Sequence, residues 1–416
     1  MIKKILIVFG LFLTISANAQ EGTASPYSFY GIGDVKFKGT VENRSMGGLS
    51  VIKDSTHINL NNPASYADLK YTTFTVGGNH NLLGLEAGSI KESASRTTFD
   101  YLSVGIPLGK FGAGFGLMPF SAVGYKIQNI NSNVTLPSYR YTGSGGVNKV
   151  YTSLSYKLSN NLSIGADLQY NFGDINTNSI SFIQDVQLGT RELNRSIVSG
   201  VNFNTGLMYD RKLSSKHTMF ASLTYAPESK LTIKNTRNIA TVIFSENFEE
   251  AVVSDQDIPV NDTKLALPSK YSVGLGFGEV RKWMIGSELT FSNSSNFGNR
   301  FNDINNVQYE NALKISFGGY YLPNYNSYSN YLKRITYRSG FNFENTGLII
   351  NNEPINNRGI TFGLGLPLGG TFSNINIGLE LGKRGTTNAG LVQENYTNLS
   401  FSLSLNDKWF VKRKFD

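Results

Sequence analysis

Long stretches of this chain alternate between apolar and small polar residues, and this alternation restricts the chain to folds built from β-strands. In residues 149–172, for example, Leu154 and Leu168 belong to the apolar set, whereas Asp167 and Gln169 belong to the polar set. Successive side chains of a strand point to opposite faces, so each such strand has one apolar and one polar face. The alternating segments run for ~9–12 residues, whereas strands of soluble proteins average ~5–6 residues.

The length of the segments favours strands that cross a membrane. A tilted strand needs ~9–11 residues to cross a bilayer, with its apolar face toward lipid and its small polar face toward the lumen of a barrel. The residues expected to face lipid are Leu154, Ile164, Leu168, Leu275, Leu379 and Phe401. The residues expected to face the lumen are Asp167, Gln169, Asn376 and Glu380.

Fourteen segments of this kind follow residue 70, and the connections between them alternate between short and long. The expected strands are 71–80, 97–108, 111–122, 147–158, 162–173, 197–210, 217–226, 269–278, 283–292, 308–321, 333–345, 359–367, 373–383 and 396–405. Short periplasmic turns and long external loops are typical of even-stranded outer-membrane barrels. Segments 178–188 and 229–246 would raise the count to sixteen, and we interpret them as hairpins within large external loops. The predicted fold is therefore an all-β, membrane-spanning, antiparallel up-and-down barrel at residues 71–405.

Residues 1–19 have the features of an export signal. Lys3 and Lys4 precede an apolar run from Ile5 to Ile15, and Ala17-Asn18-Ala19 has the small-x-small pattern of a cleavage site. The apolar run is shorter than the ~20 residues of a membrane-spanning helix. We predict a cleaved signal peptide and a location in the outer membrane of a Gram-negative cell.

Composition removes several functional classes. The chain has no Cys, 3 scattered His, and 38 Lys and Arg against 30 Asp and Glu. The lack of Cys excludes thiolate metal sites and cysteine nucleophiles. The positive charge is spread through the loops, without the compact patch of a nucleic-acid-binding protein. We therefore expect no enzyme activity, no cofactor, no metal and no nucleic-acid partner.

The region between the signal peptide and the first strand carries a motif of small and polar residues. It reads Asn43-Arg44-Ser45-Met46-Gly47-Gly48 and then Asn61-Asn62-Pro63-Ala64. Glycine pairs allow close packing or a positive φ, and a proline holds the preceding residue extended. The motif resembles the N-terminal hatch of the FadL-type long-chain fatty-acid transporter family, whose barrels also have fourteen strands. The resemblance implies that residues 20–70 plug the lumen, with Met46, Gly47, Gly48, Asn62, Pro63 and Ala64 as hatch residues.

The third expected strand has features of a weak point in the wall. Gly112, Gly114 and Gly116 precede Pro119, which cannot donate a ladder hydrogen bond. FadL-type transporters release hydrophobic cargo sideways at a kinked third strand, so the resemblance implies a lateral opening at these four residues. The alternative is that Pro119 merely ends the strand at the outer rim.

Together these features favour a channel for hydrophobic compounds, such as long-chain fatty acids, across the outer membrane. The implied partners are outer-membrane lipid and a hydrophobic small molecule in the lumen. A second hypothesis is a FadL-like accessory or scaffold protein, for example of a secretion system, that contacts other outer-membrane proteins and transports nothing, as PorV-type relatives do. A third is a nonspecific porin. Residues 406–416 form a short basic periplasmic tail that suits either solvent or an acidic partner.

Overall fold

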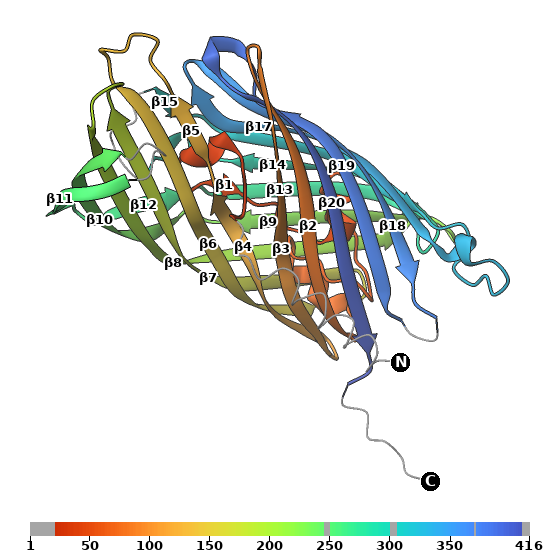
Figure 1. Cartoon of the computed structure of the whole chain (residues 1–416). Helices are drawn as coiled ribbons and strands as arrows, with labels where there is room; N and C mark the ends of the chain where they lie inside the picture. The colour runs from red at the N-terminus through yellow and green to blue at the C-terminus, as the bar shows by residue number, and fades with distance from the viewer. Residues whose placement is uncertain (1–20, 245–249, 300–305, 370–371, 410–416) are drawn as a thin grey trace.

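Long antiparallel strands form one closed wall around an internal stretch of the chain (Figure 1). The computed structural model describes residues 21–244, 250–299, 306–369 and 372–409. The signal peptide predicted at residues 1–19 and the end of the basic tail lie outside these residues. Within the described part of the chain, none of the helices has the length and apolar character needed to span a membrane.

The wall consists of fourteen strands, which confirms the number predicted from the alternation. Each pairs in antiparallel fashion with its neighbours, and the ring closes where β2 pairs with β20, from Thr72 opposite Asp407 to Glu86 opposite Gln393. The wall strands are β2 (Thr72–Ala87), β3 (Ile90–Leu108), β4 (Phe111–Val123), β6 (Ser138–Lys157), β7 (Leu162–Phe182), β8 (Leu188–Lys212), β9 (Thr218–Ala226), β13 (Lys270–Glu279), β14 (Trp283–Ser292), β16 (Ala312–Tyr321), β17 (Thr336–Ile350), β18 (Glu353–Pro367), β19 (Asn374–Arg384) and β20 (Gln393–Asp407).

Six further strands do not belong to the wall. They are β1 (Asp34–Val35), β5 (Lys126–Asn129), β10 (Ser229–Phe244), β11 (Glu250–Ile258), β12 (Thr263–Leu267) and β15 (Val307–Tyr309). Strand β10 pairs with the outer part of β8 and with β11 and β12, so the described part of 229–246 belongs to a sheet built from a long loop. Residues 178–188 form the tip of the β7–β8 hairpin. Among the residues described, three short helices lie in connections between strands: η3 (Ser294–Asn296), η4 (Tyr331–Arg334) and η5 (Asn388–Gly390).

Several wall strands are longer than predicted. Strands β3, β6, β7 and β8 have 19, 20, 21 and 25 residues. Beyond the bilayer both faces of a strand can meet water, so the apolar–polar alternation weakens and no longer reports where the strand ends. The predicted strand 308–321 is also divided, because pairing stops between β15 and β16.

The two faces of the wall differ in polarity as the alternation predicted. Leu154, Leu168, Leu275 and Phe401 on the outer face are between 50% and 58% exposed. Asp167, Gln169 and Asn376 on the inner face are at most 4% exposed. A continuous apolar outer surface would be unfavourable in water and suits contact with hydrocarbon.

Candidate functional site

Residues 21–70, which we call the N-terminal segment, lie inside the barrel and contact strands on opposite sides of the ring (Figure 1). The segment contains η1 (Pro26–Phe29), α2 (Val41–Arg44) and η2 (Pro63–Asp68), together with β1. Helix α2 contacts β18, β19 and β20, whereas η2 contacts β3, β4, β6, β7 and β8. The chain therefore crosses the lumen between these two groups of strands.

Polar side chains of the segment satisfy the ends of its own short helices. Thr40 and Asn43 form a capping box at the start of α2. Asn62 Oδ1 accepts a hydrogen bond from the backbone N–H of Ala64 at 3.1 Å, at the start of η2. Ala64 itself is fully buried. This local pairing satisfies donors that would be costly to bury unpaired.

The pair Asn62-Pro63 packs closely against β7 and β8. Asn62 is fully buried and donates from Nδ2 to the carbonyl oxygen of Leu207 at 3.0 Å. The facing wall positions are glycines: a Cβ on Gly206 would lie 2.0 Å from Asn62 Oδ1, and one on Gly165 would lie 2.5 Å from the carbonyl carbon of Pro63. The lack of a side chain at Gly165 and Gly206 therefore makes room for Asn62 and Pro63 of the segment.

Met46, Gly47 and Gly48 contact the opposite side of the ring. Gly47 has a φ of +69°, and its N–H donates to Thr361 Oγ1 at 2.9 Å. A Cβ on Gly47 would lie 2.5 Å from the carbonyl oxygen of Phe341 in β17. Gly48 has a φ of +92°, and the Met46 side chain is buried. Both glycines therefore occupy backbone conformations that other residues rarely adopt.

Charged side chains add contacts between the segment and the wall. Ser50 donates from its backbone N–H and its Oγ to Glu288 Oε2 of β14, at 2.9 and 2.7 Å. Lys53 Nζ lies 2.8 Å from Asp210 Oδ1 of β8. Hydrogen bonds to charged groups stabilise by ~1.5–3 kcal/mol when both partners are held in place. These contacts add β14 to the strands that hold the segment and strengthen its attachment to β8.

His57 connects two acidic residues within the segment. Its Nδ1 lies 2.8 Å from Asp54 Oδ2, and its Nε2 lies 3.8 Å from Glu42 Oε1. Burial lowers the pKa of His57, but the Asp54 carboxylate, aided by Glu42, outweighs burial and leaves the pKa above its ordinary value. Burial likewise raises the pKa of Asp54, and the attraction of His57 reverses this and holds it low. Among the described residues no group of three or more metal-binding side chains could hold an ion.

The three glycines of β4 lie in the part of the wall where β3 and β4 are paired. Gly112, Gly114 and Gly116 pair with β3 at Pro107, Gly105 and Ser103, respectively. A Cβ on Gly114 would lie 2.2 Å from the Tyr66 ring of η2, and one on Gly112 would lie 2.1 Å from the Tyr66 carbonyl oxygen. Gly112 and Gly114 therefore lie in close contact with the N-terminal segment, and the lateral opening at Gly112, Gly114, Gly116 and Pro119 stays a prediction.

The wall is interrupted above these glycines, between β3 and β4. Pairing of the two strands ends at Leu102 opposite Leu117, although β3 starts at Ile90. In the described structure residues 90–101 therefore have one strand neighbour, β2. Pro119 lies two residues past the last pair, where the register between β4 and β6 also shifts. Strand β4 continues to Val123, so Pro119 marks a change of neighbour within the strand.

The N-terminal segment replaces β3 beside the outer part of β4. Strand β1 pairs there with β4, with Asp34 opposite Ala122. Arg96, on the free edge of β3, lies 2.9 Å from Glu21 Oε2. A Cβ on Gly22 would lie 2.8 Å from the Ala122 side chain. The first described residues of the chain thus lie between the two separated strands.

A cavity of about 560 Å³ lies in the lumen and extends to this interruption of the wall. Arg96, Met118 and Pro119 line it at the edges of the gap. Most of the remaining lining residues are polar, namely Asn, Ser, Thr and charged residues. The volume is within the ~300–1,000 Å³ range of small-molecule sites.

Lysines dominate one part of this cavity. Lys38 of the N-terminal segment and Lys149, Lys270 and Lys314 of three wall strands line it together. Lys149 is 5% exposed, and its ammonium lies 4.2 Å from the centre of the Phe120 ring. Within the described residues no carboxylate pairs with Lys149, Lys270 or Lys314. Glu288 and Glu344 line the same cavity, so the lysines offer amino groups to an anionic ligand in surroundings of mixed charge.

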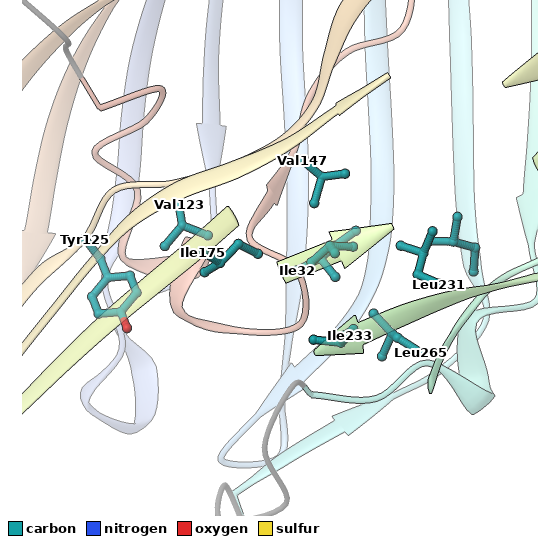
Figure 2. Close-up of a cluster of buried hydrophobic side chains, with 10 residues drawn as sticks. Ile32, Val123, Tyr125, Val147, Ile175, Leu231, Ile233 and Leu265 are labelled. Atoms are coloured by element: carbon teal, nitrogen blue, oxygen red, sulfur yellow. The ribbon is translucent and has the colours of Figure 1, made fainter. Parts of the chain in front are cut away.

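The long-loop end of the lumen also contains an apolar cluster (Figure 2). Its buried members are Ile32, Val123, Tyr125, Val147, Ile175, Val198, Leu231, Ile233, Leu265 and Leu267, none more than 7% exposed. They come from the N-terminal segment, from wall strands β4, β6, β7 and β8, from the connection between β4 and β5, and from loop strands β10 and β12. Side chains of the chain itself therefore fill this apolar space.

Wall and interior together define a class of protein: a closed fourteen-stranded β-barrel of the outer-membrane type whose N-terminal segment lies in its own lumen. A family model described as BamG matches residues 1–416, so the chain belongs to the BamG family. No curated protein sequence matches the chain.

Solved FadL-type barrels share the fold. The Pseudomonas putida toluene transporter TodX has 15% sequence identity and a TM-score of 0.61, over 90% of this chain and 100% of TodX. The Ralstonia pickettii toluene transporter TbuX has 13% identity and a TM-score of 0.58, over 89% and 99%. A Pseudomonas aeruginosa FadL homologue has 12% identity and a TM-score of 0.58, over 89% and 98%. The predicted FadL-type architecture is confirmed at the level of the fold.

Sequence reasoning missed the lysines and the apolar cluster of the interior. The alternation of the strands could have indicated the lysines. Lys149 and Lys314 precede the outward-facing Val150 and Ile315, so each occupies a position that faces the lumen. Val147 has the same phase as Lys149. Which inward positions meet across the lumen depends on the closure of the ring, and no local pattern contains that information.

Proposed function

We propose that this protein passes hydrophobic compounds with an acidic group, of the long-chain fatty-acid type, from the cell exterior into the outer membrane. The observation that carries this proposal is the interrupted pairing of β3 and β4 beside the lumenal cavity. Backbone groups left unpaired toward hydrocarbon cost several kcal/mol each, so such an interruption is tolerated where it lines a cavity.

In this proposal the parts of the interior have separate roles. The N-terminal segment acts as a hatch that blocks the axial route to the periplasm. Lys149 and Lys314 bind the acidic group of the compound through their amino groups, which have no carboxylate within ion-pair distance among the described residues. The apolar part leaves through the wall past Met118 and Pro119. TodX and TbuX, which share the fold, are toluene transporters, and this supports a hydrophobic cargo.

Equilibrium binding of a radiolabelled long-chain fatty acid to the purified protein in detergent tests the proposal. We expect saturable binding by the wild-type protein and about tenfold weaker binding by Lys149→Gln, a loss of ~1.4 kcal/mol. Lys230→Gln, on an exposed lysine of β10, is the matched control and should bind like the wild type. Binding no stronger than partition into protein-free micelles would exclude this role.

The second candidate function is an accessory or scaffold protein of the outer membrane that transports nothing. A specific observation favours it: side chains of the chain fill the apolar space of the lumen, and polar residues outnumber apolar residues around the cavity that remains. A cargo channel is expected to offer a continuous apolar path. Saturable, lysine-dependent fatty-acid binding would argue against this candidate, whereas its absence would favour it.

A further inference from the structure

The short-turn end of the barrel carries exposed basic residues without acidic partners. They lie on or beside several turns, just before the first wall strand and just after the last one. These residues are Lys70, Lys110, Arg211, Lys212, Lys216, Arg281, Lys333 and Lys408. Within the described residues none of these side chains belongs to an ion pair. Short turns of outer-membrane barrels lie on the periplasmic side of the membrane, so this surface faces the periplasm.

Acidic residues at the same end are already engaged. Asp68 and Asp210 pair with Lys53, and Glu279 pairs with Lys282 at 3.1 Å. Among the described residues at this end, Asp407 at the end of β20 is an exposed carboxylate outside these pairs. The surface therefore has a net positive charge that the barrel itself does not neutralise.

The long-loop end differs in its charge pattern. Arg195 pairs with Asp174, and Lys91 pairs with Glu86 at 3.3 Å. Exposed acidic residues such as Asp255 and Asp257 of β11 lie among the basic residues there. Mixed charge of this kind is ordinary for a solvated surface. The unbalanced charge of the short-turn end thus needs its own explanation.

One turn at the short-turn end is longer than a hairpin requires. Residues 322–335 connect β16 to β17, whereas residues 109–110 suffice between β3 and β4. In Figure 1 the light-blue turn before β17 stands out past the ends of the neighbouring strands. Backbone hydrogen bonds from Leu322 to Lys282 and from Asn324 to Lys333 hold it in shape.

This turn presents aromatic side chains together with positive charge. Tyr328 at its tip is 99% exposed, and Tyr325 and Tyr331 are 46% and 43% exposed. The guanidinium of Arg281 lies 5.0 Å from the centre of the Tyr325 ring. Tyrosine and arginine are enriched in the energetically dominant parts of protein interfaces, and an ordered turn loses little entropy on binding.

We propose that this surface, formed by the 322–335 turn and the basic residues around it, docks an acidic periplasmic protein. Charge complementarity selects the partner, and the tyrosines supply the contact area. Lipid headgroups also attract cations at the membrane surface, but the turn extends beyond the strand ends, away from the apolar band of the wall. The proposal goes beyond the cargo role, and loss of fatty-acid binding would leave it standing.

Photo-cross-linking in intact cells tests the proposal. Tyr328→p-benzoylphenylalanine places the probe at the tip of the turn, and Phe362→p-benzoylphenylalanine places it on the exposed outer wall as a reference. We expect a discrete protein adduct from position 328, identified by mass spectrometry as an acidic periplasmic protein. Position 362 should give lipid adducts.

Charge reversal then separates docking from chance contact. The triple variant Lys212→Glu, Lys216→Glu and Lys333→Glu should lower the yield of the adduct about tenfold, because charge complementarity is lost. The matched control is Lys230→Glu, Lys234→Glu and Lys264→Glu at the long-loop end, which should leave the yield unchanged. Heat-modifiable migration verifies folding of both triples, and single Lys→Gln variants replace a triple that does not fold.

Two outcomes would overturn the proposal. One is that position 328 gives only lipid adducts, which would assign the basic surface to the membrane. The other is a protein adduct whose yield survives the charge reversal in a folded barrel, which would show that the positive charge does not select the partner.

Discussion

Glycines in the wall lie where the N-terminal segment approaches it most closely. Gly112 and Gly114 face Tyr66, and Gly206 faces Asn62. A single β-carbon at such a position enters space already taken by backbone or by a rigid ring. Small side chains in the wall and the shape of the segment are therefore two parts of one packing arrangement.

Gly114→Ala should destabilise the barrel through this packing. The new Cβ would lie 2.2 Å from the Tyr66 ring, and moving the ring breaks its hydroxyl contact of 3.0 Å with Tyr151. We expect a loss of ~1–3 kcal/mol, measured by urea unfolding in lipid vesicles. Gly84→Ala is the control, because its Cβ meets only Asn395 O at 3.6 Å. Equal effects of the two changes would contradict the packing account.

Leu168→Arg tests the lipid-facing side of the wall. Leu168 is 50% exposed on β7, and an arginine near the bilayer midplane costs ~2–4 kcal/mol. Val186→Arg is the matched control, since Val186 is 48% exposed in the β7–β8 loop. Unfolding in vesicles should show the full cost for Leu168 and almost none for Val186. A similar small cost at both sites would mean that Leu168 does not face hydrocarbon.

His57 should make the stability of the N-terminal segment depend on pH. Its pKa is raised in the folded state, so its ion pair with Asp54 contributes fully below the ordinary histidine pKa of ~6.5. That contribution is lost as the pH rises through the folded-state pKa. We expect the stability difference between wild type and His57→Gln to be larger at about pH 5.5 than at about pH 9. A difference that grows with pH has the wrong sign for this account.

At the scale of elements, β4 has two parts with different strand neighbours, whereas the sequence predicted one uniform strand. Its glycine-rich half pairs fully with β3 and accepts η2, whereas its outer part leaves β3 and pairs with β1. Alternation within 111–122 predicted a strand correctly, because one face is apolar along its length. It could not show the change of neighbour, which depends on β1, a strand of two residues with no periodic signal.

Pro119→Val tests the interruption at the level of this element. Valine restores a backbone N–H and favours a regular strand, so the change should extend pairing toward β3 and slow uptake of a hydrophobic substrate. Gly114 is left intact because Tyr66 needs its space. Pro107→Val, in the paired part of β3, is the control and should not affect uptake. Unchanged uptake with Pro119→Val, in a protein shown to transport that substrate, would contradict a lateral route.

At the scale of the whole molecule, the barrel was predictable and its interior was only partly so. Fourteen alternating segments with short and long connections are sufficient to predict the ring, because each strand repeats the same local signal. The apolar cluster around Ile32 and the lysines around Lys149 arise from residues far apart in sequence that closure of the ring brings together. The phase of a strand indicates that such residues face inward, but their partners follow only from the complete topology.

In the proposed function, the N-terminal segment closes the axis of its own barrel. Its contacts with β8, β14, β17 and β18 place it across the lumen. The strands follow it in the sequence, so a chain without residues 20–66 should still insert as a heat-modifiable barrel. Removal of the segment should leave an aqueous passage along the axis.

Planar-bilayer conductance measures this directly, on purified wild-type protein and on the variant that lacks residues 20–66. We expect no stable ohmic steps from the wild type and large, long-lived steps from the variant. Stable steps of similar size from both proteins would contradict the claim, since the segment would then not obstruct the lumen.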